Sequence, residues 1–381
     1  MMTRMISRSG RLKWVLAAVL LLAAAWLWDP VKDLAYSVRL ALVLQRQASG
    51  ATGEGLAVRE IKVRRPWGSE NREALVYYPR GSSPRKAVII VAGLSELGCY
   101  HPSLVAFSRQ LAHTGVYVIT PDIREFRAFR ISAEPMEEVV FWFNQIGALE
   151  GSRRVEKTGL AGISFSATLV LIAAARSDLR DRVSFVLGIG PYCDLSRCAG
   201  EWFAAGPGTA ADGRYPTRFY AKWIIMLAAL EMVPHPGDRR SLHSVLEALL
   251  LQREIPSPEP GLTDEGKRWY RLATMRGDRS DDELVRRIEE RLAAKLYHEL
   301  DPVKSLPDLR CPAFFLHGAY DDLIPPRESL DLHQRIPRSF VLISPFLTHT
   351  HPSDRKLPLR RRVTAGLEAL MFCYRLARVI H

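Results

Sequence analysis

From residue 56 onward, short apolar runs alternate with helical repeats, and this alternation narrows the folds open to the chain. Residues 87–92 form a continuous run of apolar, largely β-branched side chains, which is typical of a strand buried on both faces. A helical period follows over 104–114, and 116–120 is the next expected strand, stopped by Pro121. Strands that alternate with helices in this way predict a three-layer, mostly parallel α/β sheet.

The same pattern predicts the other elements of the sheet and its covering helices. One strand is expected before the turn formed by Pro66, Trp67 and Gly68, and one after it. The expected strands lie at 57–63, 74–78, 158–163, 183–188, 313–316 and 340–343, and the expected helices at 137–149, 167–176 and 368–379.

The block 195–300 breaks the alternation, because it contains helical patterns and Pro/Gly turns but no convincing strand. Helices are expected there at 217–232, 241–253 and 281–300. We interpret the block as a helical lid inserted into an α/β core that comprises residues 56–194 and 301–381. The apolar residues of its first helix either line an acyl pocket or pack within the lid, as apolar stripes usually do; they are Trp223, Ile224, Ile225, Met226, Leu227 and Leu230.

Residues 1–30 have the character of a membrane anchor or signal segment. An apolar run with tryptophans at both ends spans 14–28, and counting Leu12 brings it close to the roughly 17 residues that a spanning helix needs at least. Basic residues precede it, which predicts a cytoplasmic N-terminus and a catalytic part on the other side of the membrane; these residues are Arg4, Arg8, Arg11 and Lys13. We therefore expect one N-terminal transmembrane helix.

A cleaved signal peptide is the alternative, because Ala23, Ala24 and Ala25 offer a small-residue cleavage site. In that case the protein would be secreted. We favour the uncleaved anchor, since the apolar run continues past these alanines. Residues 31–55 then form a helical stem followed by a Gly-rich linker.

Charge and cysteine content restrict the partners. The formal net charge is +12, but no zinc-finger spacing or RNA-binding signature accompanies it, so we expect no nucleic-acid partner; the excess indicates an Arg-rich surface that would suit anionic headgroups. Five scattered cysteines predict no disulfide framework, although Cys193 and Cys198 are close enough to bridge in an oxidising compartment. With no metal-type cluster and no dinucleotide fingerprint, we predict no metal and no cofactor.

The string Gly162-Ile-Ser164-Phe-Ser166 carries the chemistry. It lies between an expected strand and an expected helix, where a tight turn needs small residues two positions before and two after an exposed serine. Ser164 would sit at the N-terminus of the helix, whose dipole favours developing negative charge. An ordinary serine cap is the structural alternative.

Two later strings supply partners for Ser164. The run Leu316-His-Gly-Ala-Tyr-Asp321-Asp-Leu-Ile-Pro places an acid after a strand end, with Asp322 as the alternative to Asp321. After the last strand, the loop contains His349, with His351 as the alternative. The order serine, acid, histidine is the order of a serine hydrolase triad in one particular fold.

These motifs resemble the α/β-hydrolase superfamily over residue 56 to the C-terminus. The resemblance implies that Ser164, His349 and Asp321 act as nucleophile, base and acid, and that the backbone N–H groups of Leu94 and Phe165 hold the oxyanion. The sequence departs from the family at Ser166, where the motif has glycine, and before Gly93, where many relatives have histidine.

The resemblance implies a membrane-anchored serine hydrolase that cleaves small-molecule or lipid-like carboxylic esters through an acyl-enzyme. A peptidase or amidase, an acyltransferase on the same triad, and a non-catalytic binding protein that retains the fold are the alternatives. The sequence separates neither hydrolysis from transfer nor one oligomeric state from another.

Overall fold

The computed structural model describes residues 32–43, 46, 51–204, 217–255, 261–274, 281–349, 353 and 355–380. Eight strands form one sheet in the order β1-β2-β4-β3-β5-β6-β7-β8. Their bounds are β1 Val58–Trp67, β2 Glu70–Pro79, β3 Lys86–Val91, β4 Tyr117–Pro121, β5 Lys157–Ile163, β6 Val183–Ile189, β7 Ala313–Gly318 and β8 Ser339–Ser344.

The sheet is mixed at one edge and parallel elsewhere. β1 and β2 form an antiparallel hairpin, and β2 also pairs antiparallel with β4. All pairs from β4 through β8 are parallel. The predicted mostly parallel α/β sheet is therefore confirmed. The fourth strand ends at Pro121, as expected, although Pro121 itself is the last residue of the strand, opposite Ala74. An antiparallel end position that needs no N–H permits this.

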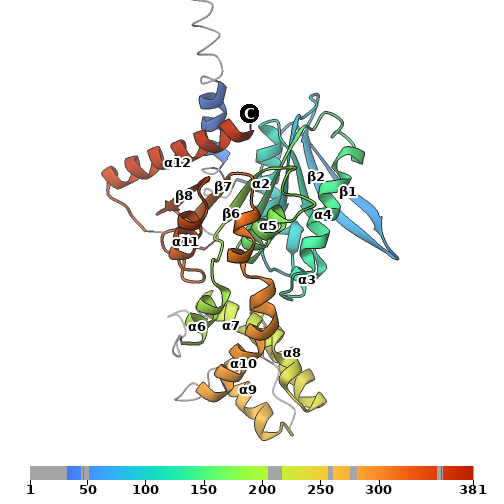
Figure 1. Cartoon of the computed structure of the whole chain (residues 1–381), viewed down its shortest axis with the longest axis vertical. Coiled ribbons are helices and arrows are strands. Elements are labelled where there is room, and N and C mark those ends of the chain that lie inside the picture. Colours follow the sequence, from blue (N-terminus) through green and yellow to red (C-terminus); the bar gives the residue numbers. More distant parts are fainter. Residues whose placement is uncertain are drawn as a thin grey trace, which may run out of the picture.

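Helices cover both faces of the sheet and make it three-layered (Figure 1). In β3, Val88 and Ile90 point into one apolar cluster and Ile89 and Val91 into the other, which explains the unbroken apolar run in the sequence. One cluster includes residues of α4 and α5, the other residues of α2, α12 and a helix over 32–43. These helices are α2 Pro102–His113, α4 Pro135–Gln145, α5 Phe165–Ala175 and α12 Leu359–Ile380.

Between β6 and β7, the described residues form helices and no strand. This group lies beyond one end of the sheet (Figure 1). Its α-helices are α6 Leu195–Ala204, α7 Thr217–Ala228, α8 Pro236–Leu250, α9 Asp264–Thr274 and α10 Asp282–Leu292. The sequence analysis missed α6 and α9, and the helix expected over 281–300 changes at Ala293–Tyr297 into a π-helical turn. That this group acts as a lid stays a prediction.

Three further differences from the sequence analysis concern single segments. The short helices α3 Arg124–Arg127 and α11 Arg327–Arg335 were not expected. All five cysteines are free and buried, so Cys193 and Cys198 do not bridge in the structure; Cys193 precedes α6, and its backbone N–H is held by the carboxylate of Glu328.

Within the part of the chain that the structure describes, no helix combines the length and the apolar character needed to cross a membrane. The apolar run 14–28 and the alanines of the alternative cleavage site lie outside the described residues.

Candidate active site

Ser164 occupies a sharp turn between β5 and α5. Its backbone has φ 60° and ψ −129°, a conformation that costs a non-glycine residue free energy and is concentrated at functional sites. Gly162 permits the turn, because a Cβ atom there would lie 2.3 Å from the carbonyl oxygen of Ser166. The small residue before the serine is thus required by the crossing of strand and helix.

Ser166, which replaces the usual second glycine, has a bonding role of its own. Its fully buried hydroxyl accepts a hydrogen bond from the N–H of Ile163 at 2.9 Å and lies 2.8 Å from the carbonyl oxygen of Val91. The side chain therefore ties the first turn of α5 to the ends of both β5 and β3. The sequence marked this position only as a departure from the family pattern.

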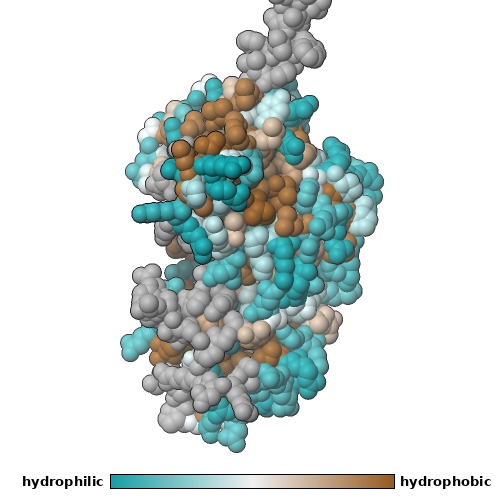
Figure 2. Space-filling model, turned by 90° about the vertical axis from the view of Figure 1, so that its left-hand side faces the viewer, coloured by the Kyte–Doolittle hydropathy of each residue, from teal (hydrophilic) through white to brown (hydrophobic). Residues whose placement is uncertain are grey.

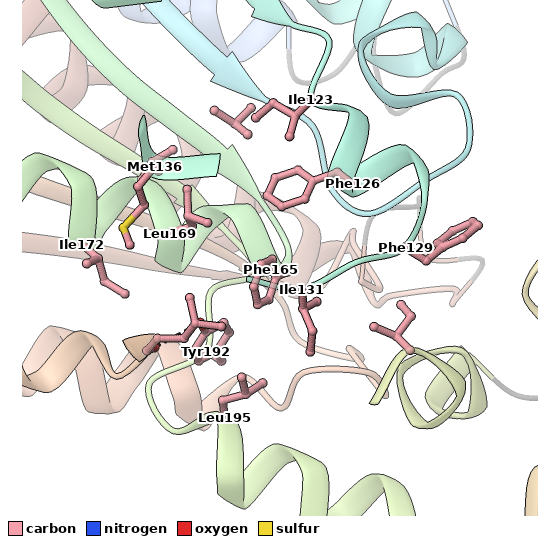
Figure 3. Close-up of a cluster of buried hydrophobic side chains, with 14 of the residues drawn as sticks. Ile123, Phe126, Phe129, Ile131, Met136, Phe165, Leu169, Ile172, Tyr192 and Leu195 are labelled. Carbon is pink, nitrogen blue, oxygen red and sulfur yellow. Dashed lines mark hydrogen bonds between the residues drawn. The ribbon is translucent and has the colours of Figure 1, made fainter. Parts of the chain in front are cut away.

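Aromatic packing around the Phe165 side chain stabilises the turn at Ser164. It packs edge-on against Phe126, with ring centroids 5.8 Å apart, and stacks on Tyr192 at 5.9 Å. Figure 3 shows Phe165 among apolar side chains that include Ile131 and Leu195. The peptide that carries the Phe165 N–H is held in place by this packing.

His349 lies within hydrogen-bonding distance of both other predicted triad residues. Its Nε2 is 2.8 Å from Ser164 Oγ, and its Nδ1 is 2.6 Å from Asp321 Oδ2. An ionised carboxylate only accepts hydrogen bonds, so Nδ1 carries the proton, Nε2 is the acceptor and the Ser164 hydroxyl donates to it. This is the arrangement that a general base needs before it removes a hydroxyl proton.

Asp321 is held in its ionised form. Burial by itself would raise its pKa, but hydrogen bonds from His317 and His349 hold the pKa of this carboxyl well below its usual range. Its second oxygen, Oδ1, accepts the backbone N–H groups of Leu323 and Ile324, both at 2.9 Å. Three N–H groups thus donate to the carboxylate, and His317 Nε2 lies 3.2 Å from its Oδ2.

His317 is the functional neighbour that the sequence reasoning missed. It is fully buried at the end of β7, with Nδ1 2.6 Å from Ser329 Oγ and Nε2 2.8 Å from the carbonyl oxygen of Ile324. The same Nε2 lies 3.2 Å from Asp321 Oδ2. His317 is therefore a positioning residue for Asp321. The only sequence signal was its place in the His-Gly pair before the acid.

The glycine of that pair brings the histidine loop to the acid. A Cβ atom on Gly318 would lie 1.8 Å from the carbonyl oxygen of Thr348, so the loop that carries His349 crosses directly over Gly318. A larger residue would displace this loop and His349 with it.

The alternatives left open by the sequence differ in their surroundings. Asp322 is exposed, whereas Asp321 is buried against His349. His351 lies outside the described residues.

Leu94 and Phe165, whose N–H groups are the expected oxyanion donors, line the same cavity as Ser164. Phe165 is the first residue of α5, so its N–H has no partner within the helix. Leu94 follows β3, and a Cβ atom on the preceding Gly93 would come within 3.6 Å of Ser164 Cβ. Leu94, Phe165 and Ser164 all line one cavity. The oxyanion role itself stays a prediction.

The cavity has a volume of about 1530 Å³ and a largely apolar wall. Trp223, Ile224 and Ile225 of α7 line it, while Met226 of the same helix is fully buried in the core. The expected apolar stripe of this helix is therefore divided between the pocket and the packing of the helical group.

A hydrogen bond joins this helical group to the loop that carries Leu94. The Tyr220 hydroxyl, from α7, donates to the carbonyl oxygen of Leu94 at 2.7 Å, and the Tyr220 ring packs edge-on against Phe129. Movement of α7 would therefore act on the loop that carries the expected oxyanion donor.

Among the residues that the structure describes, no group of three or more His, Cys, Asp or Glu side chains is arranged to hold a metal ion.

Comparison with known proteins gives a likeness of structure without a likeness of sequence. No protein-family model and no curated protein sequence matches the chain. Similar solved structures include 2,6-dihydroxy-pseudo-oxynicotine hydrolase, with 14% identity and a TM-score of 0.47 over 84% of this chain and 68% of that one. Est1E from Butyrivibrio proteoclasticus has 14% identity and a TM-score of 0.46, over 83% and 99% of the two chains. An acylaminoacyl peptidase from Pyrococcus horikoshii has 11% identity and a TM-score of 0.46, over 85% of this chain but only 41% of that one.

The fold is defined by the sheet itself. Its mixed eight-stranded order, with an antiparallel hairpin at one edge and parallel strands beyond it, fits an α/β-hydrolase fold. The turn at Ser164 and the loops that carry Asp321 and His349 follow β5, β7 and β8, at the carboxyl ends of parallel strands, where sheets of this kind bind ligands. The resemblance stated from the sequence is confirmed at the level of the fold.

Proposed function

We propose that the chain is a serine hydrolase that cleaves carboxylic esters with apolar acyl groups. The observation that carries the proposal is the continuous hydrogen-bonded path from Ser164 Oγ through His349 to Asp321, with distances of 2.8 and 2.6 Å, at the wall of an apolar cavity. A serine hydroxyl is a weak nucleophile until a base takes its proton, and this path supplies the base.

In the proposed reaction, Ser164 Oγ attacks the acyl carbon while its proton passes to His349 Nε2. The N–H groups of Leu94 and Phe165 stabilise the oxyanion of the tetrahedral intermediate. The imidazolium, stabilised by Asp321, then protonates the leaving alkoxide, and the C–O bond of the ester breaks. Water, deprotonated by the same histidine, attacks the acyl-enzyme and releases the acid.

The size of the cavity favours a long acyl chain. Its volume of about 1530 Å³ exceeds the roughly 300–1,000 Å³ of ordinary small-molecule pockets. Apolar walls on α7 and α8, among them Trp223, Ile224 and Leu249, would bury methylene groups at about 0.8 kcal/mol each. We therefore expect catalytic efficiency to rise with acyl length.

A fluorophosphonate probe tests the serine directly. The full chain in detergent is the right material, because Tyr36 and Leu40 of the helix over 32–43 pack into the core and a shorter fragment would expose that core. Ser164→Ala should abolish labelling, whereas Ser344→Ala, at another cavity-lining serine, should keep it. Equal labelling of both variants would refute the assignment.

Substrate panels separate the remaining functions. A p-nitrophenyl ester should react faster than the matching anilide; the reverse would indicate a peptidase or amidase. Acyl transfer to an added alcohol in preference to water would indicate an acyltransferase. A folded chain that reacts with neither probe nor ester would be a binding protein.

The proposal includes an N-terminal anchor over residues 14–28, with the catalytic part on the non-cytoplasmic side of the membrane. The apolar run and its basic flank support it. Alkaline extraction should leave the protein with the membrane, and N-terminal sequencing should find an uncleaved chain. Recovery of a shortened, extractable protein would favour secretion instead.

A further inference from the structure

The outer surface of α12 exposes a stripe of large apolar side chains. Four of them lie four residues apart, and thus on one side of the helix: Leu359, Val363, Leu367 and Met371, with exposed fractions between 53% and 75%. An adjacent side of the same helix is buried through Phe372, Cys373 and Leu376. Packing against the sheet therefore leaves this stripe uncovered.

The helix over 32–43 has a matching stripe. Leu34, Val38 and Leu42 are also spaced by four residues, and their exposed fractions lie between 43% and 49%. Val38 and Leu42 line the same cavity as Leu359 and Val363, so both stripes border that cavity. We call the seven residues of the two stripes the apolar face.

Figure 2 shows the side of the molecule on which α12 lies. Hydrophobic side chains gather on the upper part of this side, and hydrophilic side chains lie between them. Large apolar side chains that gather on one side of a protein's surface commonly mark an interaction site.

Charge on α12 indicates an anionic partner. The helix contains five arginines and one acid, Glu368. Arg360, Arg361 and Arg362 are all exposed next to the apolar face. An apolar helix face bordered by arginines is typical of helices that lie in the interface of an anionic membrane.

The chain connection places a bilayer beside this face. Only residues 29–31 separate the apolar run 14–28 from the described helix that begins at residue 32. Three residues reach about 11 Å at most, so a membrane-inserted run would hold the start of this helix, and Leu34 within it, close to the membrane surface.

We propose that the apolar face rests on an anionic lipid bilayer and that the cavity draws its acyl substrate from that bilayer. Membrane contact is independent of catalysis; only the identity of what enters the cavity rests on the proposed hydrolase function. Residues of the apolar face, Ser164 and residues of α7 and α8 all line this one cavity.

Site-specific fluorescence tests the contact in the full chain reconstituted into phosphatidylcholine vesicles that contain phosphatidylglycerol. The native cysteines are buried, so an NBD label will attach to an exposed cysteine introduced by Leu367→Cys or, on the neighbouring exposed position, by Glu368→Cys. The label at residue 367 should shift its emission to the blue and be quenched by doxyl-labelled lipid, while the label at residue 368 should behave as in water.

Two results would overturn the proposal. Water-like emission at both positions would mean that no bilayer covers the face. A blue shift at residue 367 that doxyl lipid does not quench would mean that protein, such as a second copy of the chain, covers it. The measurement on a Ser164→Ala background should be the same, so a failure of the proposed catalysis does not affect it.

A double substitution tests substrate entry. Leu367 and Met371 belong to the apolar face but do not line the cavity, so Leu367→Glu/Met371→Glu should leave turnover of a short soluble ester unchanged. Turnover of a long-chain ester held in vesicles should fall at least about tenfold, since burial of two large apolar side chains is lost. Leu330→Glu, at an exposed leucine of α11, should change neither rate. Unchanged turnover of the vesicle substrate by the double variant would refute entry from the bilayer.

Discussion

Asp321→Asn is the substitution for which the structure predicts the largest effect at constant shape. The carboxylate accepts the Leu323 and Ile324 N–H groups on Oδ1 and the His349 Nδ1–H on Oδ2, and His317 Nε2 lies 3.2 Å from Oδ2. An asparagine amide offers one accepting oxygen and one donating NH₂. Whichever way it turns, the NH₂ group faces at least one donor.

The two orientations of the amide fail in different ways. With its oxygen toward the backbone N–H groups, its NH₂ would force His349 to accept at Nδ1 and carry its proton on Nε2, so the imidazole could no longer take the Ser164 proton. With its oxygen toward the histidines, two buried N–H groups lose their acceptor at about 1–3 kcal/mol each, so we expect the first orientation to predominate.

In serine hydrolases that use such a triad, loss of the correct tautomer lowers kcat about 10⁴-fold, which corresponds to about 5.5 kcal/mol in the activation free energy. We expect a loss of this size for Asp321→Asn in hydrolysis of a p-nitrophenyl ester. The exposed neighbour provides the control, since Asp322→Asn should change the rate less than about threefold, within the small effects of surface substitutions. Activity of Asp321→Asn within tenfold of wild type would refute the proposed role.

The same variant predicts a pH dependence of stability. Because the pKa of Asp321 is lowered in the folded protein, its ionisation stabilises the fold above the unfolded-state pKa of about 3.9, and this contribution is lost as the pH falls below that value. Urea unfolding should therefore show a larger deficit for Asp321→Asn at pH 7 than at pH 3. An equal deficit at both values would contradict the charge-based explanation.

Three smaller perturbations test the supports of the site. Ser166→Ala removes the hydroxyl that bonds β3 and β5 and should lower the free energy of unfolding by about 1–3 kcal/mol, measured in urea; an unchanged midpoint would contradict that role. Tyr220→Phe removes the bond to the Leu94 carbonyl and should lower kcat/KM about fivefold, as expected for about 1 kcal/mol, with little change in Tm; an unchanged rate would mean that α7 does not hold the loop that carries Leu94. Gly162→Ala should prevent the turn at Ser164, because its Cβ would lie 2.3 Å from a carbonyl oxygen. Gly147→Ala is the control: a Cβ there would have nothing within 4 Å, so this variant should leave thermal unfolding unchanged. Equal stability of the two variants would refute the steric argument.

Periodicity predicted the sheet well because its central strands are buried on both faces. A run such as 87–92 has no polar face to preserve. Two of the helices between strands, α2 and α4, combine buried and exposed residues, whereas α5 is buried on all sides. Three of the four missed α-helices are short or polar, whereas α6 is neither. The helix α3 has only four residues, and α9 and α11 carry many charged side chains, so their apolar periods are too brief to stand out from turns.

The residues of the proposed triad could be predicted from local motifs, but the residues that position them could not. Ser164, Asp321 and His349 each follow a strand in a recognisable string. His317 and Tyr220 act on residues 4 and 126 positions away, and nothing in the local sequence distinguishes a histidine that fixes a carboxylate from one that merely packs. Only the folded chain shows which buried polar side chains share a partner.

The exposed side of α12 is another feature that the sequence alone does not predict. Its apolar residues lie on more than one side of the helix, since Leu376 is buried in the core while Leu367 faces outward. A period alone cannot say which of two apolar stripes meets the sheet. That choice is made by the position of α12 against β8 and the helix over 32–43, and it leaves part of the second stripe lining the same cavity as Val38 and Leu42. If α12 served only to cover the sheet, polar residues in this stripe would make the protein more soluble. Four large apolar side chains there are consistent with a surface that lies against lipid.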